Sequence, residues 1–361
     1  MKTGSNTQIY RYAFGALLGI TISVAIGGFL SYLLPVLMLP FLAANKELSI
    51  KEGLSFVGII AISVLLANIV TLLSLEYPVI LITATFLVLF FVYYSKHRLM
   101  NANMKVWLLI AILLVPNISV QSFALAQIIS LNLVEISLEC IVCVWICYYL
   151  FPASDAPTEQ AVKPTIEVDY TRTDYQRALT RTLVIMPIVL MFYFFDLMSA
   201  LLVLVFIAIL SMQAGFGAGF KAGKALIIGN LIGGLLAVVI YEVYTVVPIL
   251  SFFLLTISFI GLVIGRKLFS DIPTAPLFGM AFSTFLLIIG SSTGGGDSTA
   301  NEKVWVRVIQ IMAAVIYVAL AFGLIDKWRE SVNEAHYPNI HILIPFDSGW
   351  LMQARARVST R

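Results

Sequence analysis

Long apolar segments follow one another along almost the whole chain, separated by short polar stretches. Twelve of them can be read, at residues 13–32, 33–44, 54–73, 78–94, 104–120, 127–150, 178–195, 197–213, 225–242, 248–265, 275–291 and 304–325. A helix that crosses a bilayer needs about 20 apolar residues. The runs are too long for membrane-spanning strands, and they lack the alternation of polar and apolar residues that such strands show. The sequence therefore predicts an all-α, polytopic membrane protein with about 12 transmembrane helices.

The composition leaves no room for a soluble catalytic domain. Hydrophobic residues make up 60% of the chain and charged residues only 11%, whereas soluble domains carry about 25% charged residues. No P-loop, zinc-protease, nucleophile-elbow or dinucleotide-binding motif is found in the sequence. The cysteines Cys140, Cys143 and Cys147 share one apolar run, with no histidine nearby to complete a metal site. We therefore expect no enzyme activity, no cofactor and no metal, and we interpret the cysteines as packing residues.

The lysines and arginines predict the orientation in the membrane. If the N-terminus is cytoplasmic and all twelve segments cross, 20 of the 22 basic residues fall on the cytoplasmic side, and only Lys303 and Arg307 fall outside. This agrees with the excess of basic residues in cytoplasmic loops, and it predicts that both termini are cytoplasmic. Segment 33–44 is short and contains Pro35 and Pro40, so it either crosses as part of a tight helical pair or stays shallow.

The chain also resembles a repeat of itself. At an offset of 170 residues, Lys51 aligns with Lys221 and Pro78 with Pro248. An even number of crossings per half gives both halves the same orientation, as in parallel transporter repeats. We predict a first six-helix repeat at 1–151, a cytoplasmic linker at 152–174, a second six-helix repeat at 175–326 and a cytoplasmic tail at 327–361.

Two glutamates are the first candidates for function. Glu135 and Glu139 are four residues apart within an apolar run, so they share one face of a helix. Carboxylates inside a membrane span are costly and normally face a cavity or a partner. One interpretation is a proton-accepting pair along a substrate path. The other is that one or both pair with Arg307 or a lysine near the outer end.

A second set of residues is a candidate for binding an anion or lining its path: Lys51, Lys221, Lys224, Arg307 and Asn117. The lysines precede the third and ninth segments, and those near 221 follow several glycines, a setting in which a helix N-terminus attracts anions. The alternative is that they are ordinary cytoplasmic anchors. Gly229, Gly233 and Gly234 predict a small-residue face for close helix packing, and Asn68 and Asn230 are placed to hydrogen-bond across helices.

Several patterns together resemble a known superfamily. A basic residue lies near the start of each half (Arg11; Arg177 and Arg181), and the second half ends with Ala281-Phe-Ser-Thr-Phe and Val304-Trp-Val-Arg-Val. With the Gly-rich basic start of the ninth segment, these resemble the fusaric acid resistance and aromatic acid exporter (FUSC-like) superfamily, and its short DUF2955-type members. The resemblance covers most of residues 10–325. It implies an efflux component in the inner membrane of a Gram-negative bacterium, working with a periplasmic adaptor of the membrane-fusion type.

The leading functional prediction is a secondary efflux transporter for small organic acids, aromatic acids in particular, coupled to protons through Glu135 or Glu139. One alternative is a passive organic-anion channel, because plant malate channels resemble the same superfamily. Others are an assembly partner of an efflux complex that transports nothing itself, and a membrane enzyme acting on lipid. The predicted partners are the lipid bilayer, a small organic acid, the adaptor and a second copy of the chain, and no nucleic acid.

Overall fold

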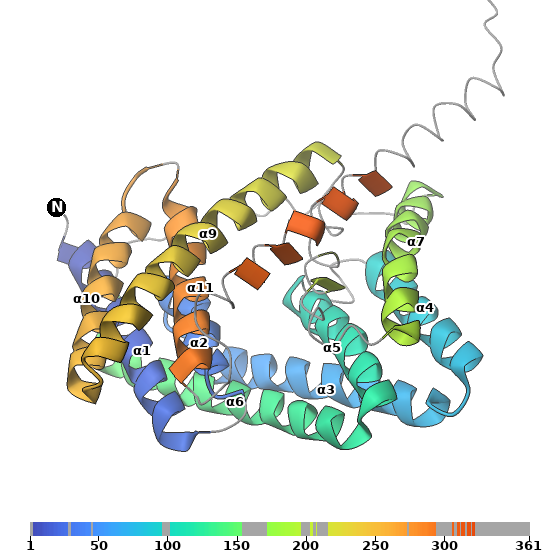
Figure 1. The fold of residues 1–361 in the computed structure, drawn as a ribbon, viewed down its shortest axis with the longest axis horizontal. Helices are drawn as coiled ribbons and strands as arrows, with labels where there is room; N and C mark the ends of the chain where they lie inside the picture. The colour runs from blue at the N-terminus through green and yellow to red at the C-terminus, as the bar shows by residue number, and fades with distance from the viewer. Residues whose placement is uncertain are drawn as a thin grey trace, which may run out of the picture. The chain divides into compact units, whose positions relative to one another are not determined.

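The structure is a computed structural model (Figure 1). It describes residues 3–27, 30–44, 46–95, 102–153, 172–195, 216–272 and 274–293, together with some residues of 203–207 and 305–321. This part of the chain is helical and contains no strand, and all of its helices belong to one compact unit, Met1–Phe322. The helices are α1 (Thr3–Ile26), α2 (Leu33–Ala43), α3 (Ile50–Ser74), α4 (Pro78–Tyr94), α5 (Ala102–Gln121), α6 (Phe123–Leu150), α7 (Arg172–Phe194), α9 (Phe216–Val246), α10 (Leu250–Leu268) and α11 (Ala275–Thr293).

Eight of the described helices are long and apolar enough to cross a membrane, which supports the prediction of a polytopic membrane protein. They lie within α1, α3, α5, α6, α7, α9, α10 and α11, while α2 and α4 are apolar but shorter. The 11 residues of α2 extend about 16 Å, against about 30 Å for the hydrocarbon core. Segment 33–44 therefore does not cross as a straight helix. The predicted segments 197–213 and 304–325 lie mostly outside the described residues.

Local sequence signals set the beginnings of several helices. The Ser49 side chain accepts a hydrogen bond from the Glu52 backbone N–H, and the Glu52 carboxylate accepts one from the Ser49 backbone N–H, which forms a capping box at the start of α3. Helix α4 begins at Pro78, where the missing N–H costs nothing. Helix α6 begins after Ser122, whose hydroxyl accepts from the Leu125 N–H.

Helices α1 and α2 form a tight hairpin. Gly27 follows α1 with a φ of 65°, a left-handed conformation that only glycine adopts without strain. A Cβ atom on Gly19 would lie 2.8 Å from the Cα atom of Pro35. The two helix backbones therefore touch, and a larger residue at position 19 would separate them.

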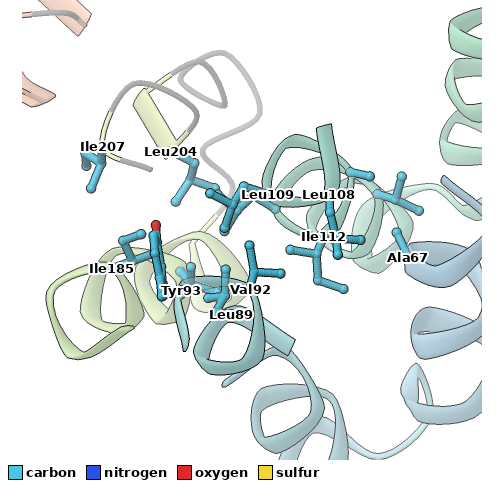
Figure 2. Packing of buried hydrophobic residues seen from close by; sticks show 14 of the residues in the cluster. Ala67, Leu89, Val92, Tyr93, Leu108, Leu109, Ile112, Ile185, Leu204 and Ile207 are labelled. Atoms are coloured by element: carbon cyan, nitrogen blue, oxygen red, sulfur yellow. The ribbon is translucent and has the colours of Figure 1, made fainter. Parts of the chain in front are cut away.

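Two buried apolar clusters hold the described helices together. The first is formed mainly by α3, α4, α5 and α7, and Figure 2 shows Leu89, Val92, Leu108, Ile112 and Ile185 packed within it. The second is formed mainly by α1, α2, α6, α10 and α11. Helix α6 packs on α2, α3 and α5 and so contacts both groups of helices.

The predicted small-residue face of α9 is confirmed at its contact with α11. A Cβ atom on Gly233 would lie 2.1 Å from the Ala281 carbonyl oxygen, and one on Gly229 would lie 2.9 Å from the Met280 Cβ. Beside this contact, the Thr284 hydroxyl donates a 2.9 Å hydrogen bond to the Asn230 side-chain oxygen. The prediction that Asn230 bonds across helices is therefore also confirmed.

Candidate functional site

Aromatic contacts show which helix ends lie together. The Phe41 and Phe56 rings lie 4.9 Å apart and the Phe56 and Trp107 rings 6.0 Å apart, which joins the end of α2 to the starts of α3 and α5. The Tyr12 and Phe269 rings, 5.7 Å apart, join the N-terminal part of α1 to the end of α10.

All the basic side chains that the structure describes lie at this one end of the helices, which we call the basic end. They are Arg11, Lys46, Lys51, Lys105, Arg177, Arg181, Arg266 and Lys267. The predicted orientation places nearly all basic residues on one side of the membrane, so it requires their side chains to lie at one end of the helices. Because α2 returns the chain to the end at which α1 began, the hairpin satisfies this pattern even though α2 is short.

Arg11 is fully buried at the basic end, where it joins three helices. Its Nη1 donates to the Phe151 carbonyl at 3.3 Å and its Nη2 to the Ala44 carbonyl at 3.4 Å. The guanidinium carbon lies 4.2 Å from the centre of the Tyr148 ring, within cation–π range. The Tyr148 hydroxyl in turn donates to the carbonyls of Phe41, at 2.9 Å, and Ala44.

The two carbonyls that Arg11 binds belong to the C-caps of α2 and α6. Carbonyls at the end of a helix lack intrahelical donors and carry the negative end of the helix dipole. Arg11 therefore places its charge against two helix C-termini at once, and we call this arrangement the Arg11 clamp. Sequence reasoning treated Arg11 as a cytoplasmic charge and as part of a family pattern. The signal that it is structural is a lone arginine inside an otherwise apolar helix.

Further bonds fasten the segment between α2 and α3 to α6 and α1. The Trp145 indole N–H donates to the Leu48 carbonyl at 3.0 Å, and the Ala153 N–H donates to the Glu47 carboxylate at 3.3 Å. Gln8 donates to the Ala43 carbonyl at 3.4 Å. Together with the Arg11 clamp, these bonds close the basic end between α1, α2 and α6.

The predicted glutamate pair lies near the middle of α6. Glu135 is twelve residues into this 28-residue helix, its side chain is exposed, and that of Glu139 is partly buried. The two carboxylates are close enough to repel each other. Neither forms an ion pair within the described part of the chain, where the single salt bridge joins Lys46 and Glu52. The pairing of the glutamates with Arg307 is not tested, because Arg307 lies outside the described residues.

A polar network joins α3 to α6 between the glutamates and the start of α6. Asn68 on α3 donates to the Ser130 hydroxyl at 3.0 Å and accepts from the Gln127 amide at 2.6 Å. This confirms the prediction that Asn68 hydrogen-bonds across helices. Ser130 precedes Glu135 by five residues, so the network lies about 7.5 Å from it along the helix axis.

The predicted anion-binding residues are not brought together where the structure describes them. Lys51 is exposed in the first turn of α3, at the basic end. Asn117 is buried fifteen residues into α5, and it donates to the Leu113 carbonyl of its own helix at 2.6 Å. The side chains of Lys221 and Lys224, like Arg307, lie outside the described residues.

The structure adds Lys105 to the pair Arg177 and Arg181, a grouping that sequence reasoning did not make. Lys105 near the start of α5 donates to the carbonyl of Ser95, the C-cap of α4. Arg181 on α7 lies close enough to Lys105 and to Arg177 for their charges to repel. The residues are up to 76 positions apart in the sequence, so their proximity depends on the tertiary packing of α4, α5 and α7.

The three cysteines Cys140, Cys143 and Cys147 are buried and unpaired on α6. Among the residues that the structure describes, no group of three or more His, Cys, Asp and Glu side chains is placed to hold a metal.

Comparison with known proteins gives one family match, which lies in the N-terminal part of the chain. Residues 8–149 match the model of a family described as a protein of unknown function, DUF2955. The match includes Arg11, Glu135 and Glu139, and it extends from α1 to α6. No curated protein and no solved structure matches the chain. The prediction of a DUF2955-type sequence is therefore supported over these residues, and the wider superfamily resemblance stays a prediction.

Proposed function

We propose that this chain is a secondary efflux transporter that exports small organic acids, aromatic acids in particular, in exchange for protons. The observation that carries the proposal is the Glu135–Glu139 pair midway along a helix long enough to cross a membrane. An ionised carboxylate at the centre of a bilayer costs about 2.5–3.5 kcal/mol on insertion scales. It is therefore stable only when it is protonated or faces water or a cation. A group that alternates between these states is what proton coupling requires.

The basic end supports an anionic substrate. Clustered positive charge raises the local concentration of anions and their rate of encounter. Lys51 contributes to this field, and Lys221, Lys224, Arg307 and Asn117 complete the predicted anion path. The glutamate pair and the Asn68 network provide polar groups further along the helices.

The proposal includes an architecture of two parallel six-helix repeats, in which the short α2 pairs with α1 and does not cross as a straight helix. Helices at the same position in the two halves make matching contacts. Helix α1 packs on α10, and its counterpart α7 packs on α4. Likewise α3 packs on α5, and its counterpart α9 packs on α11. We place the basic end, both termini and the linker 152–174 in the cytoplasm, and the chain in the bacterial inner membrane. A periplasmic adaptor of the membrane-fusion type is the proposed partner, on the basis of the family resemblance.

The test is export of radiolabelled 4-hydroxybenzoate from loaded cells that express the chain, with and without a protonophore. The wild-type chain should export the acid, and the protonophore should abolish export. The double variant Glu135→Gln, Glu139→Gln should reach the membrane in normal amounts and lose coupled export. Glu76→Gln is the control, because Glu76 is an exposed carboxylate just beyond the end of α3.

Other outcomes distinguish the alternatives. Export that persists with the protonophore and follows the anion gradient identifies a passive organic-anion channel. Normal coupled export by the double variant removes Glu135 and Glu139 from the mechanism. Absence of export of any acid, with the chain still bound to a periplasmic adaptor, leaves the assembly-partner alternative.

A further inference from the structure

Helix α6 presents an exposed face that follows a seven-residue spacing. Four side chains seven residues apart are exposed: Ile128, Glu135, Val142 and Tyr149. Leu131 and Leu138 lie three residues after the first two of these, and they are 71% and 55% exposed. Positions that recur at spacings of three and four residues form the line of contact between two helices in a left-handed coil. We call these six side chains the α6 seam.

The opposite face of α6 makes the contacts within the described part of the chain. Side chains that are buried on this face include Ser130, Leu133, Ser137, Cys140, Val144 and Cys147. Successive residues of a helix are about 100° apart around its axis, and this places the buried set on the side of α6 away from the seam. Helix α6 packs on α1, α2, α3 and α5. The α6 seam is therefore open to whatever surrounds the chain in the membrane.

Glu135 lies deep in the membrane if α6 crosses it. It is twelve residues after Phe123 and fifteen before Leu150, the two ends of α6. At 1.5 Å per residue, these ends are about 18 Å and about 22 Å away along the helix axis. The hydrocarbon core is about 30 Å thick, so the carboxyl group lies well inside it. Lipid tails offer no hydrogen bond to a carboxyl group, which makes a lipid-facing Glu135 costly.

Other exposed faces of the described helices suit lipid. In segment 304–325 the exposed side chains of Ile309, Met312 and Ile316 are all apolar. In the part of the chain that the structure describes, the other exposed charges on helices lie within two turns of a helix end: Lys51, Glu52, Arg177, Glu242, Arg266 and Lys267. The α6 seam differs from these faces because it needs a polar partner at the depth of Glu135.

A second copy of the chain supplies such a partner. All copies have the same orientation in one membrane, so a two-fold axis along the membrane normal brings two α6 helices together in parallel. Each Glu135 then reaches the depth of the other. A protonated carboxyl group donates a hydrogen bond and an ionised one accepts it, so the two carboxyls complement each other when they share one proton. Asn132 and Glu139 flank Glu135 on α6 and add polar groups at this depth.

We propose that two copies of the chain associate through the α6 seam, with Glu135 hydrogen-bonded to the partner's Glu135. A polar residue at one position of an otherwise apolar seam fixes the register and the number of helices. Polar side chains also join helices within membranes. The apolar members of the seam pack on either side of Glu135 and shield the shared proton from lipid. This inference goes beyond the proposed function and does not depend on it.

The first experiment is disulfide cross-linking of the full-length chain in membranes. Leu131→Cys and Leu138→Cys should each give a disulfide between two copies on oxidation with copper phenanthroline, seen as a product of twice the 39.8 kDa of one chain. The wild-type chain should give none, because its three cysteines are buried on the other face of α6. Phe259→Cys is the matched control, because Phe259 is 66% exposed near the middle of α10, and it should give no disulfide.

The second experiment measures association of fluorescently labelled chains in phosphatidylcholine vesicles by energy transfer. Glu135→Leu should weaken association about tenfold, the loss of a hydrogen bond between helices. Glu135→Gln should keep it within threefold, because two facing amides also donate and accept. Glu135 is exposed, so both variants should fold. Resistance of the α6 cysteines to maleimide, as in the wild-type chain, checks that they do.

Three results would overturn this assignment. One is a single copy per vesicle at every protein concentration, together with no disulfide at position 131 or 138. Another is wild-type association, within twofold, in a folded Glu135→Leu chain. The third is a disulfide from position 138 to a protein of another mass, such as the adaptor, which would give the seam a different occupant.

Association and export fail separately. Seam-dependent dimers of a chain that exports no acid would contradict the proposed function and leave the dimer standing. Coupled export by vesicles that hold one copy each would do the reverse. The Glu135→Gln, Glu139→Gln chain should still form the dimer even though it loses coupled export.

Discussion

Removing the guanidinium of the Arg11 clamp should loosen α6 from α1 and α2. Arg11→Ala deletes two hydrogen bonds to helix C-caps, at 3.3 and 3.4 Å, and the contact with the Tyr148 ring at 4.2 Å. Hydrogen bonds to charged groups contribute about 1.5–3 kcal/mol each, and these are long, so we take the lower value. A desolvated cation–π contact adds about 1 kcal/mol or more.

The combined loss is about 4 kcal/mol. This free energy corresponds to roughly a thousandfold rise in the population in which α6 is open. This free energy is that of local opening of α6, because a chain of this size need not unfold in one step.

The cysteines of α6 provide the assay. Cys140, Cys143 and Cys147 are buried and free, so a maleimide reaches them only when α6 opens. The labelling rate of the purified chain follows the open population when closing is faster than labelling. Arg11→Ala should therefore label several hundredfold faster or more than the wild-type chain. Arg266→Ala is the control, because this arginine is exposed in the last turn of α10 and its loss costs about 0.3–1 kcal/mol.

A labelling rate in Arg11→Ala within threefold of the wild type would refute this reasoning. It would mean that the carbonyls of Ala44 and Phe151 find other donors at no cost. Arg11→Lys should fall between the two, because an ammonium keeps the charge and cannot reach both carbonyls in the same geometry.

Other contacts give further predictions, each measured by the midpoint of thermal unfolding in detergent. Gly233→Ala should lower the midpoint, because its Cβ would overlap the Ala281 carbonyl and overpacking costs about 1–3 kcal/mol. The control is Gly58→Ala, whose Cβ would meet nothing within 4 Å. This variant should leave the midpoint unchanged or raise it. Ser49→Ala should cost about 1 kcal/mol through loss of the α3 cap, and an unchanged midpoint would show that the cap is not needed. Asn68→Ala removes bonds between α3 and α6 and should cost about 0.6 kcal/mol or more.

The sequence predicted those features that depend on neighbours along the chain. Apolar runs predicted helices because an α-helix satisfies its own backbone within one segment, and Gly233 predicted close packing because small residues recur along one face. The sequence also indicated that segment 33–44 was unusual, but it did not decide whether the segment crosses. The length of α2 shows that it does not do so as a straight helix.

Features that join distant parts of the chain could not be predicted. Arg11 binds a carbonyl 140 residues away, and no pattern near Arg11 identifies that partner. The grouping of Lys105 with Arg181 was missed for the same reason, since nothing in the sequence near either residue indicates the other. Glu135 and Glu139 could be found because they are four residues apart on one helix. The group that each carboxylate faces depends on tertiary packing, and it could not be predicted.

The Arg11 clamp also has a consequence for how the chain is made. One of its acceptors is the carbonyl of Phe151, 140 residues downstream. A ribosome adds about 5–20 residues per second, so the first helix waits on the order of ten seconds before this acceptor has been synthesised. During that time α1 has already left the ribosome, and its buried cation lacks one of its two carbonyl acceptors. Insertion of α1 should therefore be reversible until α6 follows, and chains truncated before residue 151 should be degraded faster than chains truncated after it.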